Sequence, residues 1–208
     1  MGTPLNEGLS FVHNALVGAG LRNEIRVIAS GKVNTGFQLA TKLALGADMC
    51  NAARAMMFAL GCIQALRCNT NRCPTSVATQ DPELVCGLHV GDKTQRVARF
   101  HRETVKSFLE VLGAAGLMEP RELEPWYVMK RVQPGDVRSY HELYPPTEPG
   151  ALLAPLVTGS LAGAWCEARA DRFGGRRAVV VARLSPRCAG ARRGLRRDQR
   201  RRATTSRS

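Results

Sequence analysis

The chain has 208 residues, 44% of them hydrophobic, and a formal net charge of +13. This length and apolar fraction suffice for a domain with a core and exclude a disordered protein, and no apolar run reaches the roughly 18 residues of a membrane-spanning helix. Most of the charge lies in residues 174–208, which hold twelve Arg, no Lys and one acid, so residues 1–173 carry only +2. This distribution argues against nucleic acid as a partner of the body of the protein.

The N-terminus shows no basic segment followed by an apolar one, so the sequence predicts no secretory signal and a cytoplasmic location. In that compartment the seven cysteines are expected to be reduced thiols, metal ligands or core residues, and a disulfide framework is not expected.

Hydrophobic periodicity predicts alternating helices and strands in the first half of the chain. Either Asn34 or Thr35 is suited to cap the second helix. A strand, a turn, a helix and a strand within about thirty residues predict a βαβ unit with parallel strands. The predicted elements are a helix over 6–17, a strand over 25–29, a helix over 36–45, a strand over 47–51 and a helix after Arg54 that runs through Met57 to Leu60.

The second half predicts one long helix between irregular segments. Asp92 and Gln95 have the spacing of a capping box, which favours a helix over 93–112 with an apolar stripe. Residues 79–91 and 117–150 predict irregular and turn-rich structure, with short helical pieces at 120–123 and 139–143. The arginine-rich residues 174–208 predict a disordered tail, for which a natural basic tail and an out-of-frame translation both remain open.

Each predicted strand ends in a turn of small residues, ASGK after the first and NAAR after the second. Gly31 can adopt a positive φ, and successive backbone N–H groups ahead of a helix can bind a phosphate. The two turns are therefore candidate phosphate-binding segments, although small residues also suit any tight turn between a strand and a helix.

Three cysteines, Cys62, Cys68 and Cys73, lie in the stretch GCIQALRCNTNRCP with C-x5-C-x4-C spacing. Three soft ligands on one short polar loop are typical of iron–sulfur sites and of some zinc sites. A zinc ion would need a fourth ligand, for which Cys86 and His89 are candidates. A cluster with three nearby cysteines is either [3Fe-4S] or [4Fe-4S] with a distant fourth ligand.

The segment from ASGKVNTG through CNAARAMM to CPTSVATQ resembles the end of the FMN-binding barrel of the glutamate synthase family, and the resemblance extends over residues 2–144. It implies an α/β fold, namely the C-terminal portion of a TIM (β/α)8 barrel. It also implies that Ser30, Gly31, Lys32, Ala52, Ala53 and Arg54 surround the phosphate of FMN, and that Cys62, Cys68 and Cys73 ligate a [3Fe-4S] cluster.

The activity implied by this resemblance is the reduction by FMN of 2-iminoglutarate, formed from 2-oxoglutarate and ammonia, with electrons relayed by the cluster from ferredoxin or an NAD(P)H-linked donor. The family's strands 1–6 and its Gly-rich HDGGTGAS-type segment have no counterpart in this sequence. We therefore expect an incomplete barrel over 1–116 with its cluster loop at 61–80, a closing extension over 117–173 and the tail. Such a chain should be inactive alone, and a complementing barrel fragment is a candidate partner.

Two other hypotheses remain from the residues alone. One is a zinc-stabilised basic protein associated with nucleic acid, which would explain the arginine-rich segment but not the two turns. The other is a metal-binding interaction module without catalysis, which would have to be a stable monomer without flavin.

Overall fold

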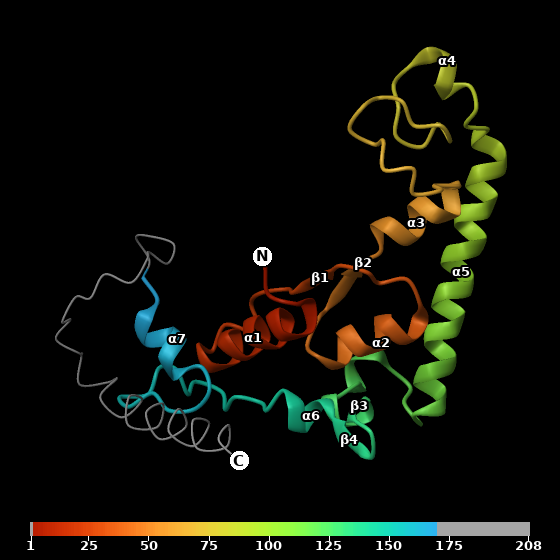
Figure 1. Cartoon of the computed structure of the whole chain (residues 1–208). Helices are drawn as coiled ribbons and strands as arrows, with labels where there is room; N and C mark the ends of the chain where they lie inside the picture. Colours follow the sequence, from red (N-terminus) through yellow and green to blue (C-terminus); the bar gives the residue numbers. More distant parts are fainter. Residues whose placement is uncertain (1, 170–208) are drawn as a thin grey trace. The chain divides into compact units, whose positions relative to one another are not determined.

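The computed structural model describes residues 2–169 and shows a mixed α/β protein (Figure 1). The chain divides into two compact units. Among the described residues the first contains 2–10 and 26–145, and the second contains 11–25 and 146–169.

The first unit is built on a two-stranded parallel sheet, as the sequence predicts. Strand β1 (Ile28–Ser30) pairs with β2 (Met49–Asn51), with Ile28 opposite Met49 and Ser30 opposite Asn51. Ala29 is buried and Cys50 is half-buried on one face of this sheet, whereas Ile28 and Met49 remain about half exposed on the other. One face therefore packs on the core and the other is uncovered.

Both strands are shorter than predicted. The predicted strand over 25–29 begins at Ile28 and the one over 47–51 begins at Met49. The reason is Asp48, whose Oδ2 accepts a hydrogen bond from Val27 N at 2.7 Å and whose Oδ1 lies 3.5 Å from Arg26 Nη1. A side chain thus occupies the backbone donor that a longer β-ladder would use.

Helix α2 (Gly36–Ala44) connects the two strands and packs on their covered face. Thr35, and not Asn34, is its N-cap, because Thr35 Oγ1 accepts a hydrogen bond from Gln38 N at 3.2 Å. The core of the unit consists of Leu9, Ala29, Ala40, Ala44, Leu45, Ala47, Phe108, Leu112, Leu123, Val128 and Tyr140.

The long helix α5 (Val90–Ala114) packs against α2 and against α3 (Ala53–Leu60), as Figure 1 shows. The predicted capping box of Asp92 and Gln95 is wrong. His89 is the N-cap, because its Nδ1 accepts a hydrogen bond from Asp92 N at 3.3 Å, and the helix therefore starts three residues earlier than predicted. Within the segment predicted to be irregular, residues Pro82–Val85 form the one-turn helix α4.

Residues 117–145 contain a β-hairpin that the sequence analysis missed. Strands β3 (Met129–Gln133) and β4 (Asp136–Ser139) pair antiparallel around a turn in which Gly135 has a φ of 83°. The predicted helical pieces are confirmed as the 3-10 helix η1 (Pro120–Glu122) and helix α6 (Tyr140–Leu143), and a second 3-10 helix, η2 (Pro125–Tyr127), lies between η1 and β3. A capping box of Ser139 and Glu142 starts α6.

A polar cluster fastens this extension to the beginning of the chain. Asn6 Nδ2 donates to the Tyr140 hydroxyl at 3.3 Å, and Asn6 Oδ1 accepts a bond from Lys42 Nζ. The Tyr144 hydroxyl donates to Glu7 Oε1 at 3.3 Å, and burial beside Glu7 raises the pKa of Tyr144 to about 12. The hydroxyl therefore stays protonated as a donor at every physiological pH.

The first predicted helix is confirmed as α1 (Leu5–Gly18). The residues of α1 from position 11 onward belong to the second unit. In that unit Gly150 N and Leu152 N donate to the carbonyls of Val17 and Gly18 at 3.1 and 3.0 Å. A small core of Leu152, Val157, Leu161 and Ala162 includes the start of helix α7 (Ala162–Glu167), which was not predicted.

Two strands of a parallel sheet agree with part of a (β/α)8 barrel, and the complete barrel stays a prediction, as do the proposed domain limits. Among the described residues no helix is both long and apolar enough to cross a membrane. The tail predicted for 174–208 lies outside the described residues.

The contact between α2 and α5 generates a prediction about Gly36. A Cβ at this position would lie 2.7 Å from the carbonyl carbon of Ser107 and closer still to Phe108 N, so the two helices would have to separate. We expect Gly36→Ala to lower the free energy of unfolding by about 1–3 kcal/mol, the range typical of overpacking. Urea denaturation of the purified chain measures this.

The matched control is Gly113→Ala on α5, where an added Cβ would meet no atom within 4 Å. Alanine is the better helix former, so this variant should be neutral or more stable by about 0.5–1 kcal/mol. Equal destabilisation by both substitutions would show that the close approach at Gly36 does not limit the packing of α2 on α5.

Candidate functional site

The two predicted phosphate-binding turns begin side by side. Ser30 and Asn51 are register partners at the carboxyl ends of β1 and β2. Both turns, one starting at Ser30 and the other at Ala52, therefore leave the sheet at the same end of the strands. Ligands of parallel α/β proteins bind outside the carboxyl ends of the strands. The structure thus brings together the two segments that the sequence analysis selected separately.

The first turn has an unusual backbone. Gly31 has a φ of 148° and Lys32 a φ of 53°, both in a region that L residues other than glycine rarely adopt. Gln38 Oε1 accepts a hydrogen bond from Asn34 N at 2.8 Å, which fixes the path of the chain into α2. Ser30, Gly31 and Lys32 are all exposed.

The second turn leads into α3, whose N-terminus is open. Its N-cap residue, Ala52, has no side chain that could accept a hydrogen bond from the first turn, and Ala53 and Arg54 are exposed. Backbone N–H groups at an uncapped helix N-terminus, with a nearby guanidinium, form a donor set that suits a phosphate. The residues present therefore fit the phosphate group predicted for this place.

The three predicted cluster ligands lie on the segment that follows α3. Cys62 comes just after the helix and is half-buried, Cys68 is exposed and Cys73 is buried, and all three are free thiols. Cys62 Sγ accepts a hydrogen bond from Gln64 N at 3.5 Å. Within residues 2–169 the structure gathers no group of three Cys, His, Asp or Glu side chains close enough to bind one metal ion.

Cys73 lies among hydrogen-bond donors. A bond with the Thr75 hydroxyl, 3.5 Å away, and bonds from the backbone N–H groups of Ala78, Thr75 and Val77 lower the pKa of the Cys73 thiol to about 7. Cluster sulfurs accept N–H bonds of this kind, which influence reduction potentials. The donor chemistry of three thiols, one of them among N–H groups, fits an iron–sulfur cluster.

Backbone conformations that are rare for residues other than glycine are confined to these two regions. In the described part of the chain five such residues have a positive φ, and they are Lys32, Gln64, Leu66, Asn71 and Ser76. The first is in the phosphate turn and the other four are in the loop 61–80. Strain of this sort is found at ligand clamps and active sites, where the surrounding structure must maintain it.

Polar bonds hold the loop 61–80 together. Asn71 Oδ1 accepts from Gln80 N at 2.6 Å, and the Thr79 hydroxyl donates to the Asn71 carbonyl at 2.6 Å. The Ser76 hydroxyl donates to the Leu84 carbonyl, which ties the loop to α4. Sequence analysis missed these residues, and the only available signal was the two asparagines between Cys68 and Cys73, since Asn tolerates positive φ.

The two candidates for a fourth zinc ligand have other roles. Cys86 Sγ donates to the Glu83 carbonyl at 3.0 Å beside α4, and His89 Nδ1 is the acceptor that caps α5. These bonds form part of the local secondary structure. The arrangement therefore does not favour a four-ligand zinc site.

Comparison with known proteins gives a match over most of the described chain. The family profile described as a conserved region in glutamate synthase matches residues 1–118. The glutamate synthase large subunit-like protein YerD of Bacillus subtilis is 39% identical over 137 residues, which are 66% of this chain and 26% of that protein. The archaeal glutamate synthase (NADPH) of Methanocaldococcus jannaschii is 39% identical over 117 residues, 56% of this chain and 23% of its own length.

A third relative is the ferredoxin-dependent glutamate synthase of Pyropia yezoensis, which is 39% identical over 83 residues, 40% of this chain and 5% of that protein. The chain spans about a quarter of the length of the first two relatives.

The hydrogen bonds of Asn71 generate a prediction about the loop. Asn71→Ala removes the acceptor of Gln80 N and places Ala at a φ of 59°, so the loop should open more often. We expect faster amide hydrogen exchange in residues 77–82, measured by mass spectrometry of the purified chain. The neighbouring exposed Asn69 offers the control, because Asn69→Ala should leave that exchange unchanged, and an equal effect of both variants would contradict the role of Asn71.

Proposed function

The chain belongs to the glutamate synthase family, and we propose on that premise that it carries the flavin-phosphate site and the iron–sulfur loop of a glutamate-forming oxidoreductase. The family generally uses flavin and iron–sulfur cofactors. The observation that carries the proposal is the juxtaposition of two open strand-to-helix turns, followed directly by a C-x5-C-x4-C-P loop, within the matched residues 1–118.

In this proposal Ser30, Gly31, Lys32, Ala52, Ala53 and Arg54 bind the phosphate of FMN. The backbone N–H groups at the start of α3 supply directed donors, and the side chains of Lys32 and Arg54 supply positive charge. When bound, FMN supplies the electrons that convert 2-iminoglutarate, formed from 2-oxoglutarate and ammonia or glutamine nitrogen, into glutamate. The chain's own contribution is to fix the phosphate end of the cofactor.

Cys62, Cys68 and Cys73 are the proposed ligands of a [3Fe-4S] cluster that relays electrons from ferredoxin or an NAD(P)H-linked donor. Cluster ligation requires reduced thiols, and Cys62, Cys68 and Cys73 are free, whereas Cys166 is disulfide-bonded, contrary to the expectation from the sequence. The separation of the three thiols means that the loop must rearrange when a cluster binds. Metal binding and local folding are then coupled.

The chain alone is proposed to be inactive. Its parallel sheet exposes Ile28 and Met49 on one face, although parallel sheets are normally covered on both faces. The strands also have unpaired edges in the described residues. We propose that further βα units complete the barrel, whether they come from the same polypeptide or from a complementing one, and that these units supply the binding pocket for 2-oxoglutarate.

Iron and acid-labile sulfide in the anaerobically purified and reconstituted chain test the cluster. We expect iron and sulfide in the chain itself and their loss in Cys68→Ser and Cys73→Ser. Cys86→Ser is the control, because Cys86 is an exposed free thiol outside the motif and should leave the content unchanged. Bound zinc without sulfide would contradict the proposal and favour the zinc-stabilised alternative.

An assay of glutamate formation tests the proposed inactivity. The purified chain, supplied with FMN, 2-oxoglutarate, ammonia and a reductant, should form no glutamate above the level of the same mixture without protein, because the binding pocket for 2-oxoglutarate is proposed to come from the further βα units. Formation of one or more glutamates per bound flavin would contradict the need for further barrel units.

A further inference from the structure

The residue just before the first predicted cluster ligand lies beside two cations from a different helix. A Cβ placed on Gly61 would lie 3.5 Å from Lys93 Nζ and 4.0 Å from Arg96 Nη1. Lys93 and Arg96 are three positions apart on α5, so they project from the same side of that helix. Two positive charges from α5 therefore converge on the point where the chain enters the loop 61–80.

The end of α3 holds Cys62 in a defined place next to these cations. Gly61 is the C-cap of α3 and has a φ of 109°, a left-handed conformation that suits glycine. Cys62 N donates to the Met57 carbonyl at 3.0 Å, so the backbone of the first ligand continues directly from the helix. Since α3 packs against α5, the packing of these two helices positions Cys62 relative to Lys93 and Arg96.

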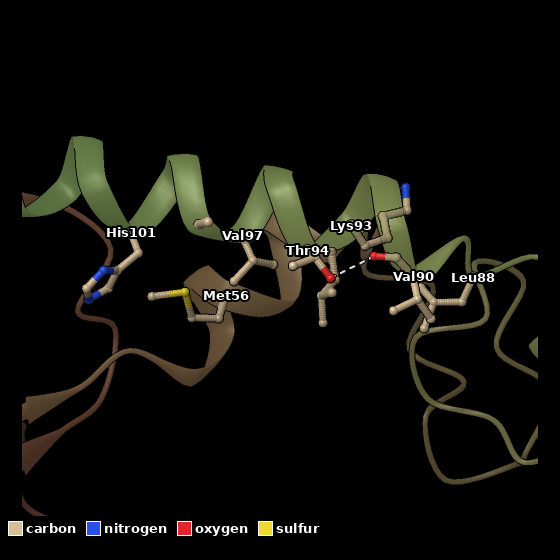
Figure 2. A pocket seen from close by; sticks show the side chains of 9 residues that line it. Met56, Leu88, Val90, Lys93, Thr94, Val97 and His101 are labelled. Atoms are coloured by element: carbon tan, nitrogen blue, oxygen red, sulfur yellow. Dashed lines mark hydrogen bonds between the residues drawn. The ribbon is translucent and has the colours of Figure 1, made fainter.

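The two cations differ in their exposure to solvent. Only 20% of the Lys93 side chain is exposed, and Figure 2 shows its ammonium group directed away from Met56 and Val97. Arg96 is exposed. Solvent and salt screen a partly buried charge less than a surface charge, so Lys93 should exert the stronger field on its surroundings.

One anion opposes this pair of cations. Asp92 Oδ2 lies 3.6 Å from Lys93 Nζ, and 58% of the Asp92 side chain is exposed. An ion pair that is open to water offsets only part of the charge of its partner. Asp92, Lys93 and Arg96 together leave a net charge of +1 beside Gly61.

The proximity of these charges to Gly61 does not depend on a free surface. An apolar groove between α3 and α5, which Met56 and Val97 help to line, is open in the described residues, and the further βα units proposed above are one possible occupant of it. Lys93, Arg96 and Gly61 belong to the packed pair of helices itself. Coverage of the groove would therefore leave their proximity unchanged.

We propose that Lys93 and Arg96 raise the reduction potential of the iron–sulfur centre that Cys62 helps to ligate. The inference rests on the proposed function. Three thiolates contribute negative charge to such a centre, and uptake of one electron from the donor adds to it. Nearby cations therefore stabilise the reduced form more than the oxidised form. The structural alternative is that the two cations only stabilise the carboxyl end of α3, where the helix dipole is negative.

The test is a redox titration of the anaerobically reconstituted chain at about 0.1 M salt, followed by electron paramagnetic resonance. Lys93→Gln with Arg96→Gln should lower the potential by an amount equal to about a tenfold change in the reduction equilibrium, which is about 59 mV for one electron. Lys93→Glu should lower the potential about twice as far as Lys93→Gln. Lys93→Arg keeps the charge and should keep the potential.

Asp92→Asn separates the proposal from the structural alternative. It removes the anion beside Lys93 and neither cation, so it should raise the potential, which a role confined to the end of α3 does not predict. The matched control is Lys106→Gln on the same helix, thirteen residues beyond Lys93. That spacing is about 20 Å along the axis, beyond the Debye length of about 10 Å, so this variant should leave the potential unchanged.

Iron and sulfide content, measured for every variant, distinguishes the two ways in which the idea can fail. A loaded chain whose potential is the same with and without Lys93 and Arg96 overturns the proposal and leaves the proposed function standing. Equal lowering by Lys106→Gln also overturns it, because net charge alone would then set the potential. If a Gln variant takes up no cluster, an unchanged potential in loaded Asp92→Asn still overturns the proposal. A parent chain that takes up no iron and sulfide overturns both.

Discussion

The short parallel pairing of β1 with β2 is the constraint on which the rest of the first unit depends. Three residues on each strand determine the register, and that register places Ser30 beside Asn51. Ser30 is itself a candidate cofactor residue, and the other candidates follow Ser30 or Asn51, either in the next few residues or in the loop 61–80. A slip of one strand by one residue would reverse the faces of that strand and turn either Ala29 or Cys50 out of the core. Asp48, through its bond to Val27 N, marks where the pairing begins.

Two different kinds of interaction maintain the two ends of this unit. Around α2 the stabilisation comes from apolar packing, with Ala40 and Ala44 small enough to let α5 approach and Phe108 filling the space. The loop 61–80 has little apolar burial and depends on the bonds of Asn71, Ser76 and Thr79. A loop with positive φ at four residues and few apolar contacts is a segment whose stability a bound cofactor can increase substantially.

Sequence patterns predicted the parts of this structure that local chemistry determines. Helical spacing located α1, α2 and α5. The short helix predicted at 139–143 is α6, and the local reason for it is the capping box of Ser139 and Glu142. The hairpin β3–β4 escaped because its strands are exposed and rich in charge, so no alternation of apolar and polar residues marked them. The cap at His89 escaped because histidine is an uncommon N-cap and Asp92 offered a more familiar pattern. The cysteine spacing predicted which three thiols are candidate metal ligands. The distances between these thiols depend on the conformation of the loop, which the spacing does not determine.

The exposed face of the β1–β2 sheet has a chemistry that limits what can cover it. The sheet offers unpaired backbone groups at its edges together with Ile28 and Met49, and only further strands satisfy both. Permanent coverage suits this surface, because an open parallel sheet is costly at all times.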